Sequence, residues 1–315
     1  MLRHLTLLAA LFMLPAACSM NRLIADNMTS SFADIRTAFF DEASPQQGFY
    51  GGPALLKQLD GFIVSSPKNE ALLLNAAELN CGYAMTFLDR SDPEWAGQLY
   101  GKGRAYALRG LAEVNPELAA AVVATDEAAL QKLLPEIDRE DDLPLLFFTG
   151  LCWGGQVNAT MDETMAADLG VIEMIFQACL DKDPTFYYGA GYTFFGMLNA
   201  GRTEMLGGNL EKGREFFEKA SKMCDGKFLM TRLMYATAYA VNSQNAELYV
   251  RLLTEVANSK FEDPSDMRLP NAVARRDARQ LLGRVKDFFP GYEGPSGQEP
   301  HVDFIEDDDA NLDLD

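Results

Sequence analysis

Histidine, the side chain that most often transfers protons near neutral pH, is nearly absent from this sequence. The 315 residues contain two, His4 and His301, one near each end of the chain. A nucleophilic Ser-His-Asp or Cys-His site, or a histidine-rich zinc site, needs histidine inside the fold. No pair of carboxylates stands out as an acid–base dyad. We therefore expect no enzyme and no catalytic residues, since any turnover would have to rely on carboxylates or a bound metal.

The cysteines do not suggest a redox or metal site. Cys81, Cys152, Cys179 and Cys224 all lie in apolar, helical surroundings without a CxxC spacing. Export from the cytoplasm would permit disulfides, with three possible pairings. We expect buried free thiols, with disulfide pairing as the alternative. No metal and no cofactor are expected.

The last residues are strongly acidic. Residues 291–315 contain nine Asp and Glu and no Lys or Arg, which predicts a disordered tail over 290–315. Four of its residues alternate like the first ligands of a calcium loop: Asp307, Asp309, Asn311 and Asp313. The loop's glycine at position six and glutamate at position twelve are missing, so a solvated tail is the better interpretation.

The first residues are typical of a targeting segment. Arg3 precedes a ten-residue apolar run, Leu5 to Leu14, which is too short to span a bilayer. Leu-Pro-Ala-Ala-Cys follows and looks like the lipobox of bacterial lipoproteins, although Pro15 stands where an aliphatic residue is usual. We predict a signal peptide over 1–17 and lipidation of Cys18, and Ser19 after it favours the outer membrane by resemblance. The alternative is an ordinary signal peptide cut after Ala17.

Composition and charge restrict the classes of molecule that the protein is expected to bind. A hydrophobic content of 48% predicts a folded chain. A net charge of −19 disfavours nucleic acid and anionic membrane surfaces, because both need a basic face.

Apolar residues recur every three to four positions along the chain, and no segment alternates convincingly, so the fold class is all-α. Ser44 to Gly48 should break one helix, and Pro53 should lie in the first turn of the next. Asp138–Asp142 should be a solvated turn. The predicted helices are 21–40, 53–66, 69–89, 93–114, two pieces in 116–134, 143–160, 162–181, 184–200, 209–222, 228–241, 246–256 and 269–289.

Two of these helices share a spacing found in tetratricopeptide (TPR) repeats. Gly213, Phe217 and Ala220 follow the 4-then-3 interval of the small-aromatic-small positions, and the interval recurs at Gly103, Ala107 and Gly110. The spacing predicts a superhelix of TPR-like antiparallel helix pairs, as a single domain over 18–289.

Glycines beside aromatic residues mark two central helices, 143–160 and 184–200. The residues that could line a cleft for an apolar ligand are Trp153, Phe186, Tyr188, Tyr192 and Phe195. Residues 186–198 are apolar on every side, which predicts a fully buried helix, and plain core is the alternative to a cleft. Glu78 is a further candidate contact in an apolar helix, or it is hydrogen-bonded at the helix surface.

Together these motifs resemble the T component of tripartite ATP-independent periplasmic (TRAP) transporters. The family usually has a Tyr-Trp pair in its central helix, whereas here Cys152 precedes Trp153. The resemblance covers roughly residues 20–288 and rests on Cys18, 51–56, 69–87, 104–111, Trp153-Gly154, 189–220, Tyr235-Ala236 and 268–271.

The resemblance implies a periplasmic lipoprotein without catalytic residues. It implies association with the solute-binding protein of a TRAP system, assistance in the uptake of small ligands, and a homo-oligomer, with a trimer as one form. The alternative is a helical-repeat scaffold lipoprotein of envelope protein assembly, which would use the same helices only for protein contacts.

Overall fold

The computed structural model describes residues 29–160 and 168–294. The predictions of a signal peptide, of lipidation at Cys18 and of a disordered tail beyond residue 294 lie outside this part of the chain. Within it every regular element is a helix, which confirms the all-α class. The superhelix of TPR-like pairs stays a prediction.

The chain divides into two compact units. Unit 1 contains the described residues of Met1–Ala38 and Tyr50–Asp168, and unit 2 contains Phe39–Phe49 and the described residues of Leu169–Asp315. We describe each unit by itself. That residues 18–289 form one domain stays a prediction.

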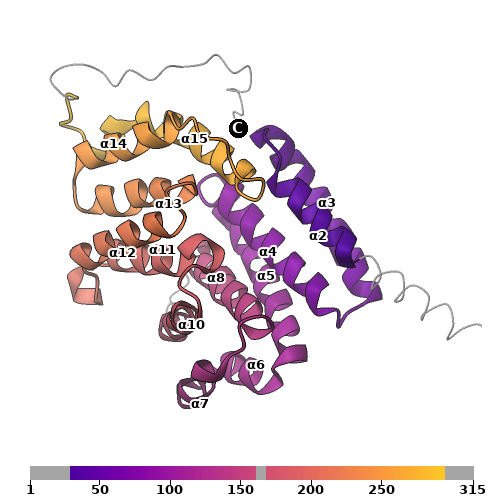
Figure 1. The fold of residues 1–315 in the computed structure, drawn as a ribbon. Coiled ribbons are helices and arrows are strands. Elements are labelled where there is room, and N and C mark those ends of the chain that lie inside the picture. Colours follow the sequence, from indigo (N-terminus) through magenta and orange to yellow (C-terminus); the bar gives the residue numbers. More distant parts are fainter. Residues whose placement is uncertain (1–28, 161–167, 295–315) are drawn as a thin grey trace, which may run out of the picture. The chain divides into compact units, whose positions relative to one another are not determined.

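Unit 1 is built around helices α4, α5 and α8, which contact one another (Figure 1). A π-helical turn, η1, extends α4, and a 3₁₀ turn, η2, follows α7. The bounds are α2 Thr29–Phe40, α3 Pro45–Ser65, α4 Glu70–Tyr83, η1 Ala84–Leu88, α5 Pro93–Val114, α6 Pro116–Val123, α7 Glu127–Leu133, η2 Leu134–Glu136 and α8 Asp142–Thr160. Helices α2 and α3 extend a few residues into unit 2.

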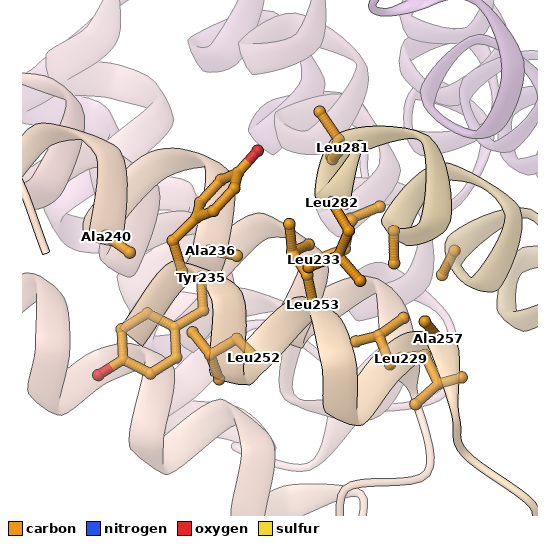
Figure 2. Packing of buried hydrophobic residues seen from close by; sticks show 14 of the residues in the cluster. Leu229, Leu233, Tyr235, Ala236, Ala240, Leu252, Leu253, Ala257, Leu281 and Leu282 are labelled. Atoms are coloured by element: carbon orange, nitrogen blue, oxygen red, sulfur yellow. The ribbon is translucent and has the colours of Figure 1, made fainter. Parts of the chain in front are cut away.

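Unit 2 is a series of helix pairs, in which α11 contacts α12 and α14 contacts α15. Figure 2 shows its core, where Leu233 and Leu253 approach Leu282 across neighbouring helices. The bounds are α10 Leu169–Lys182, α11 Phe186–Gly201, η3 Glu204–Leu206, α12 Leu210–Met223, α13 Leu229–Met234, η4 Tyr235–Ala240, α14 Ala246–Ala257, α15 Arg268–Leu282 and α16 Val285–Phe288.

Side-chain caps fix several helix starts where the sequence predicts them. Asn69 accepts a hydrogen bond from the Leu72 amide, and Asn209 accepts one from the Lys212 amide. Asp92 caps α5 in the same way, directly before Pro93. Each cap satisfies a backbone N–H that has no partner inside its helix.

The prediction for the start of α3 is wrong. The helix begins at Pro45, so the segment 44–48 starts it, and Pro53 lies inside it. The Ser44 hydroxyl accepts a hydrogen bond from the Gln47 amide at 3.3 Å, and proline suits the first helical position because its missing N–H would be unpaired there. The predicted solvated turn at 138–142 is also wrong at its end, since Asp142 is buried and bonded to Asn115.

Helix α11 is not the fully buried helix predicted for 186–198. All of its aromatic residues are half-buried, and Met197 is exposed. Tyr187, Tyr188 and Gly189 have positive φ angles, so the first turn is kinked. Positive φ is strained for residues with a side chain, and glycine alone adopts it freely.

The last predicted helix, 269–289, is split. Helix α15 ends at Leu282, and α16 starts at Val285 after a break at Gly283 and Arg284. The half-buried Arg275 of α15 has its guanidinium bonded inside unit 2 to Asp263.

Two helices contain π-helical turns that the sequence does not reveal. The turn Ala84–Leu88 continues α4, and the turn Tyr235–Ala240 continues α13. Such turns are rare in proteins, and those that occur are often found near functional sites. In unit 1 the π turn immediately precedes Asp89, a half-buried carboxylate discussed below.

Candidate functional site

Glycines bring α5 and α8 close together. A Cβ added to Gly103 would lie 2.7 Å from Cys152 Sγ, and one added to Gly110 would lie 2.5 Å from Leu145 Cδ2. Residue numbers fall along α8 as they rise along α5, so the two helices are antiparallel. The close approach is possible because these positions of α5 carry no side chain.

Arg104 and Trp153 meet at the centre of this helix pair. The Arg104 guanidinium carbon lies 3.5 Å from the centroid of the Trp153 ring, and Trp153 is fully buried. Stacking of guanidinium on indole is a favourable cation–π arrangement. The contact holds the guanidinium against one face of the ring and leaves its N–H edge for other partners.

That edge has no partner in the described part of the chain. Arg104 Nε and Trp153 Nε1 are both buried without a hydrogen bond. Nearly all buried polar atoms in proteins are hydrogen-bonded, so two adjacent unpaired donors call for an explanation.

A third polar group lies one turn along the same interface. A Cβ added to Gly101 would lie 2.9 Å from Nε2 of Gln156, so this glycine makes room for the amide. Gly101 precedes Arg104 by one helical turn, and Gln156 follows Trp153 by one turn. Gln156 is half-buried, and its side-chain amide has no hydrogen-bond partner among residues 29–160 and 168–294.

Among the described residues, no carboxylate forms an ion pair with Arg104. Burial lowers the pKa of the Arg104 guanidinium, and the nearby negative charge of Asp168 acts in the opposite direction. Asp168 makes neither a hydrogen bond nor an ion pair with Arg104 in the described structure. Arg104 stays protonated at physiological pH, because an arginine pKa is far above 7.

Two other carboxylates of unit 1, Glu78 and Asp60, are paired. Arg36 forms a bidentate ion pair with the buried Glu78, with Nε 2.6 Å from Oε2, which accounts for Glu78 without a ligand. Asp60 accepts hydrogen bonds from Lys102 Nζ and the Tyr106 hydroxyl, both at 2.7 Å.

Asp89 is paired but electrostatically unusual. It accepts a hydrogen bond of 2.7 Å from the Tyr100 hydroxyl. Burial raises the pKa of Asp89 to about 6, although the hydrogen bond from Tyr100 and the charge of Arg90 act to lower it. Its carboxyl group therefore titrates close to neutral pH.

The aromatic candidates of unit 2 lie in two groups on α11. Tyr192 and Phe195 both pack against Phe216 of α12, with ring centroids 6.3 and 5.4 Å apart. Tyr188 instead packs against Phe228 at 4.7 Å and donates a hydrogen bond of 2.5 Å to Asp266.

Phe186 is half-buried at the start of α11. Trp153 belongs to unit 1 and the other four candidates to unit 2, so the structure describes two separate sets of residues. That they line one apolar cleft stays a prediction.

Sequence reasoning identified Trp153 but missed Arg104 and Gln156 as candidates. Arg104 falls within the segment 104–111 that carries the family resemblance, yet a single arginine in a helix carries no information about its partner. Only the antiparallel pairing of α5 with α8 places Arg104 over Trp153.

Neither metal ligands nor a membrane span are found in residues 29–160 and 168–294. No group of His, Cys, Asp and Glu residues there could hold a metal ion. No helix in these ranges has both the length and the apolar character to cross a bilayer. The four cysteines are free, and three of them are buried.

Comparison with known proteins gives the family. No curated protein matches the chain. The model of the TRAP transporter T-component family matches residues 49–289, which include all of α4 to α15. This is a family of transporter accessory proteins and not an enzyme class. The match spans most of the chain and agrees with the motifs above, so the protein belongs to the TRAP transporter T-component family.

Proposed function

We propose that the protein is the lipid-anchored periplasmic accessory component of a TRAP-type solute uptake system, in which it docks the substrate-binding protein. Lipid on Cys18 would attach it to the periplasmic face of the envelope, more specifically to the outer membrane. It would act as a homo-oligomer, such as a trimer, and hold a small ligand with apolar character.

Membership of the T-component family is the observation that carries this proposal. Surface features support it. Met205 is 96% exposed and Leu206 is 71% exposed, both in the short turn η3 between α11 and α12. Exposed apolar residues at a hairpin tip favour contact with another molecule, since water solvates them poorly.

Capture of the full-length, tagged protein from gently solubilised envelopes tests the docking. We expect a periplasmic solute-binding protein to co-elute in near-equal amount. A matched Cys18→Ala variant should lose membrane attachment and keep the partner. Co-elution of only outer-membrane assembly proteins, or of nothing, would contradict the proposal and favour the scaffold alternative.

Native mass spectrometry of the purified protein tests the apolar ligand and the oligomer. We expect a bound small molecule whose amount falls in a Tyr192→Ala, Phe195→Ala double variant, because both rings are half-buried against Phe216. Tyr50→Ala is the control, as Tyr50 is an exposed tyrosine of another helix, α3. An unchanged amount of bound ligand in the double variant would show that this part of α11 does not line the cleft.

A further inference from the structure

Three side-chain groups lie together between α5 and α8 without a hydrogen-bond partner in residues 29–160 and 168–294: the Arg104 guanidinium, the Trp153 indole and the Gln156 amide. Trp153 is completely buried, so water does not replace its missing partner at the surface. The three side chains belong to two helices and lie within one helical turn of one another along the α5–α8 interface. We propose that Arg104, Trp153 and Gln156 bind the carboxylate group of a small ligand.

The chemistry of the three side chains selects an acceptor with negative charge. An indole N–H and a guanidinium can only donate hydrogen bonds, and an amide adds two more N–H donors. The guanidinium is also a full positive charge without a bonded counterion. A ligand that completes this site must therefore be an anion that accepts several hydrogen bonds.

The geometry favours a planar anion. Because the Arg104 guanidinium lies over the Trp153 ring, that face is covered and its edge remains for binding. The edge of a guanidinium offers two parallel N–H groups that match the two oxygens of a carboxylate. The indole N–H and the Gln156 amide then supply donors beside that fork.

Two of the three side chains are partly accessible to solvent. Arg104 and Gln156 are half-buried, whereas Trp153 is fully buried, so the donor set extends from the interior towards solvent. The side-chain amide of Gln156 occupies the room that Gly101 leaves at the surface of α5. A small ligand can thus reach the guanidinium from outside, with its carboxylate directed inwards.

A purely structural role explains the arrangement less well. Arg36, Lys102 and Tyr106 in the same unit all bond to a carboxylate, so unit 1 does not generally leave such groups unpaired. Asp168 acts on Arg104 through its charge alone. If Asp168 competes with the ligand for Arg104, its removal should strengthen binding.

The inference deepens the proposed function, and its physiological meaning rests on that proposal. It names the polar group of a ligand for which sequence reasoning predicted only apolar character. The binding site itself is tested on the purified chain without any partner. A failure of docking and a failure of carboxylate binding are therefore distinguishable.

Fluorescence titration of the purified full-length protein tests the site. The chain has two tryptophans, so a Trp95→Phe background isolates the signal of Trp153. The probes are acetate, hexanoate and succinate at constant ionic strength, with hexanamide as the uncharged match of hexanoate and inorganic phosphate as a non-planar anion. We expect saturable binding of a carboxylate and at least tenfold weaker binding of hexanamide and phosphate.

Substitutions then assign the response to Arg104. Arg104→Met should abolish binding, Arg104→Lys should weaken it at least tenfold, and Asp168→Asn should strengthen it. Arg109→Met is the matched control, because Arg109 is exposed on the same helix and should leave affinity unchanged. Thermal unfolding of each variant checks that it remains folded.

Three results would overturn the proposal. They are the absence of saturable binding for every carboxylate probe, binding that persists in a folded Arg104→Met variant, and phosphate binding as tight as that of the best carboxylate. If Arg104→Met does not fold, Gln156→Glu provides the second test. It places a like charge beside the ligand and should weaken binding at least tenfold, and unchanged affinity in that variant would also overturn the proposal.

Discussion

Arg104 in unit 1 and Arg275 in unit 2 are both half-buried arginines on helices, yet their surroundings differ. Arg275 makes two hydrogen bonds to Asp263, of 2.7 and 2.9 Å, and its Nε donates to Ser259 at 2.9 Å. Arg104 stacks on Trp153 and leaves its Nε unpaired. Asp263 and Ser259 accept hydrogen bonds from the Arg275 guanidinium, whereas Arg104 Nε has no acceptor among the described residues.

The difference separates a structural arginine from a candidate binding arginine. Asp263 also accepts a hydrogen bond from Asn271, whose side-chain oxygen accepts from the Leu229 amide. This network therefore ties α15 to the preceding loop and to α13. Nothing comparable surrounds Arg104, so its charge remains available to a ligand.

The largest effect should follow from breaking the network of unit 2. Asp263→Ala removes the acceptor of both terminal nitrogens of Arg275 and one of the two acceptors of the Asn271 amide. We expect a loss of about 3–5 kcal/mol in the free energy of unfolding. Urea unfolding measures the loss, and amide hydrogen exchange locates it in α13 and α15. A loss below about 1 kcal/mol would remove the contrast between the two arginines.

The next largest effect tests the close approach of α5 and α8 that places Arg104 over Trp153. Gly103→Ala puts a methyl group 2.7 Å from Cys152 Sγ and 3.1 Å from the Ala77 carbonyl oxygen. We expect a destabilisation of about 1–3 kcal/mol from overpacking.

The matched control for Gly103→Ala is Gly61→Ala. Nothing lies within 4 Å of the added carbon at Gly61, so the change should stabilise α3 by about 0.5–1 kcal/mol, because alanine favours a helix more than glycine does. Equal effects of the two substitutions in urea unfolding would show that the α5–α8 contact is loose.

A smaller effect depends on pH and is confined to unit 1. The pKa of Asp89 is raised to about 6 from an ordinary value of 3.8. Its protonated form therefore stabilises the fold fully below pH 3.8, and this contribution is lost as the pH rises through about 6. Asp89→Asn should remove a pH dependence on the order of 1 kcal/mol.

Comparing urea unfolding of wild type and the Asp89→Asn variant between pH 4.5 and 7 isolates this contribution from those of other carboxylates. A constant difference between the two proteins over that range would show that Asp89 titrates normally.

The smallest expected effect is that of removing the Arg104 charge, and it tests the contrast between Arg104 and Arg275 most directly. Arg104→Met should change the free energy of unfolding by less than about 1 kcal/mol, since it removes an unpaired charge and keeps an apolar side chain on Trp153. Urea unfolding at pH 7 measures it beside Asp263→Ala. A loss of 3 kcal/mol or more would make Arg104 as structural as the Arg275 network.

Local rules predicted much of the fold. Helix α5 starts at Pro93 and α12 follows the cap Asn209, as the predicted ranges have it, and the small residues Gly213 and Ala220 are buried where their spacing places them. These features depend on neighbours within a few residues. Pro53 shows the limit of this reasoning, because proline inside a helix of 21 residues looks like a helix start in the sequence.

The candidate site could not be predicted in the same way. Its key contact joins Arg104 to Trp153 across 49 positions and requires the antiparallel alignment of α5 and α8. The bonded state of Arg275 likewise depends on Asp263, which lies in a loop. The sequence shows that both residues are charged arginines. Only the tertiary structure shows that Arg275 is paired with a carboxylate and that Arg104 is not.

The π-helical turn at Ala84–Leu88 has a consequence for comparing sequences within the family. Such a turn fits one extra residue into an otherwise α-helical segment, and each residue turns an α-helix by about 100°. The extra residue sets the direction in which Asp89 leaves the helix towards Tyr100. A family member that is one residue shorter between Tyr83 and Asp89 would continue as a plain α-helix. Its acidic residue at the aligned position would point away from the tyrosine, so a single-residue gap there would predict the loss of the Asp89–Tyr100 pair.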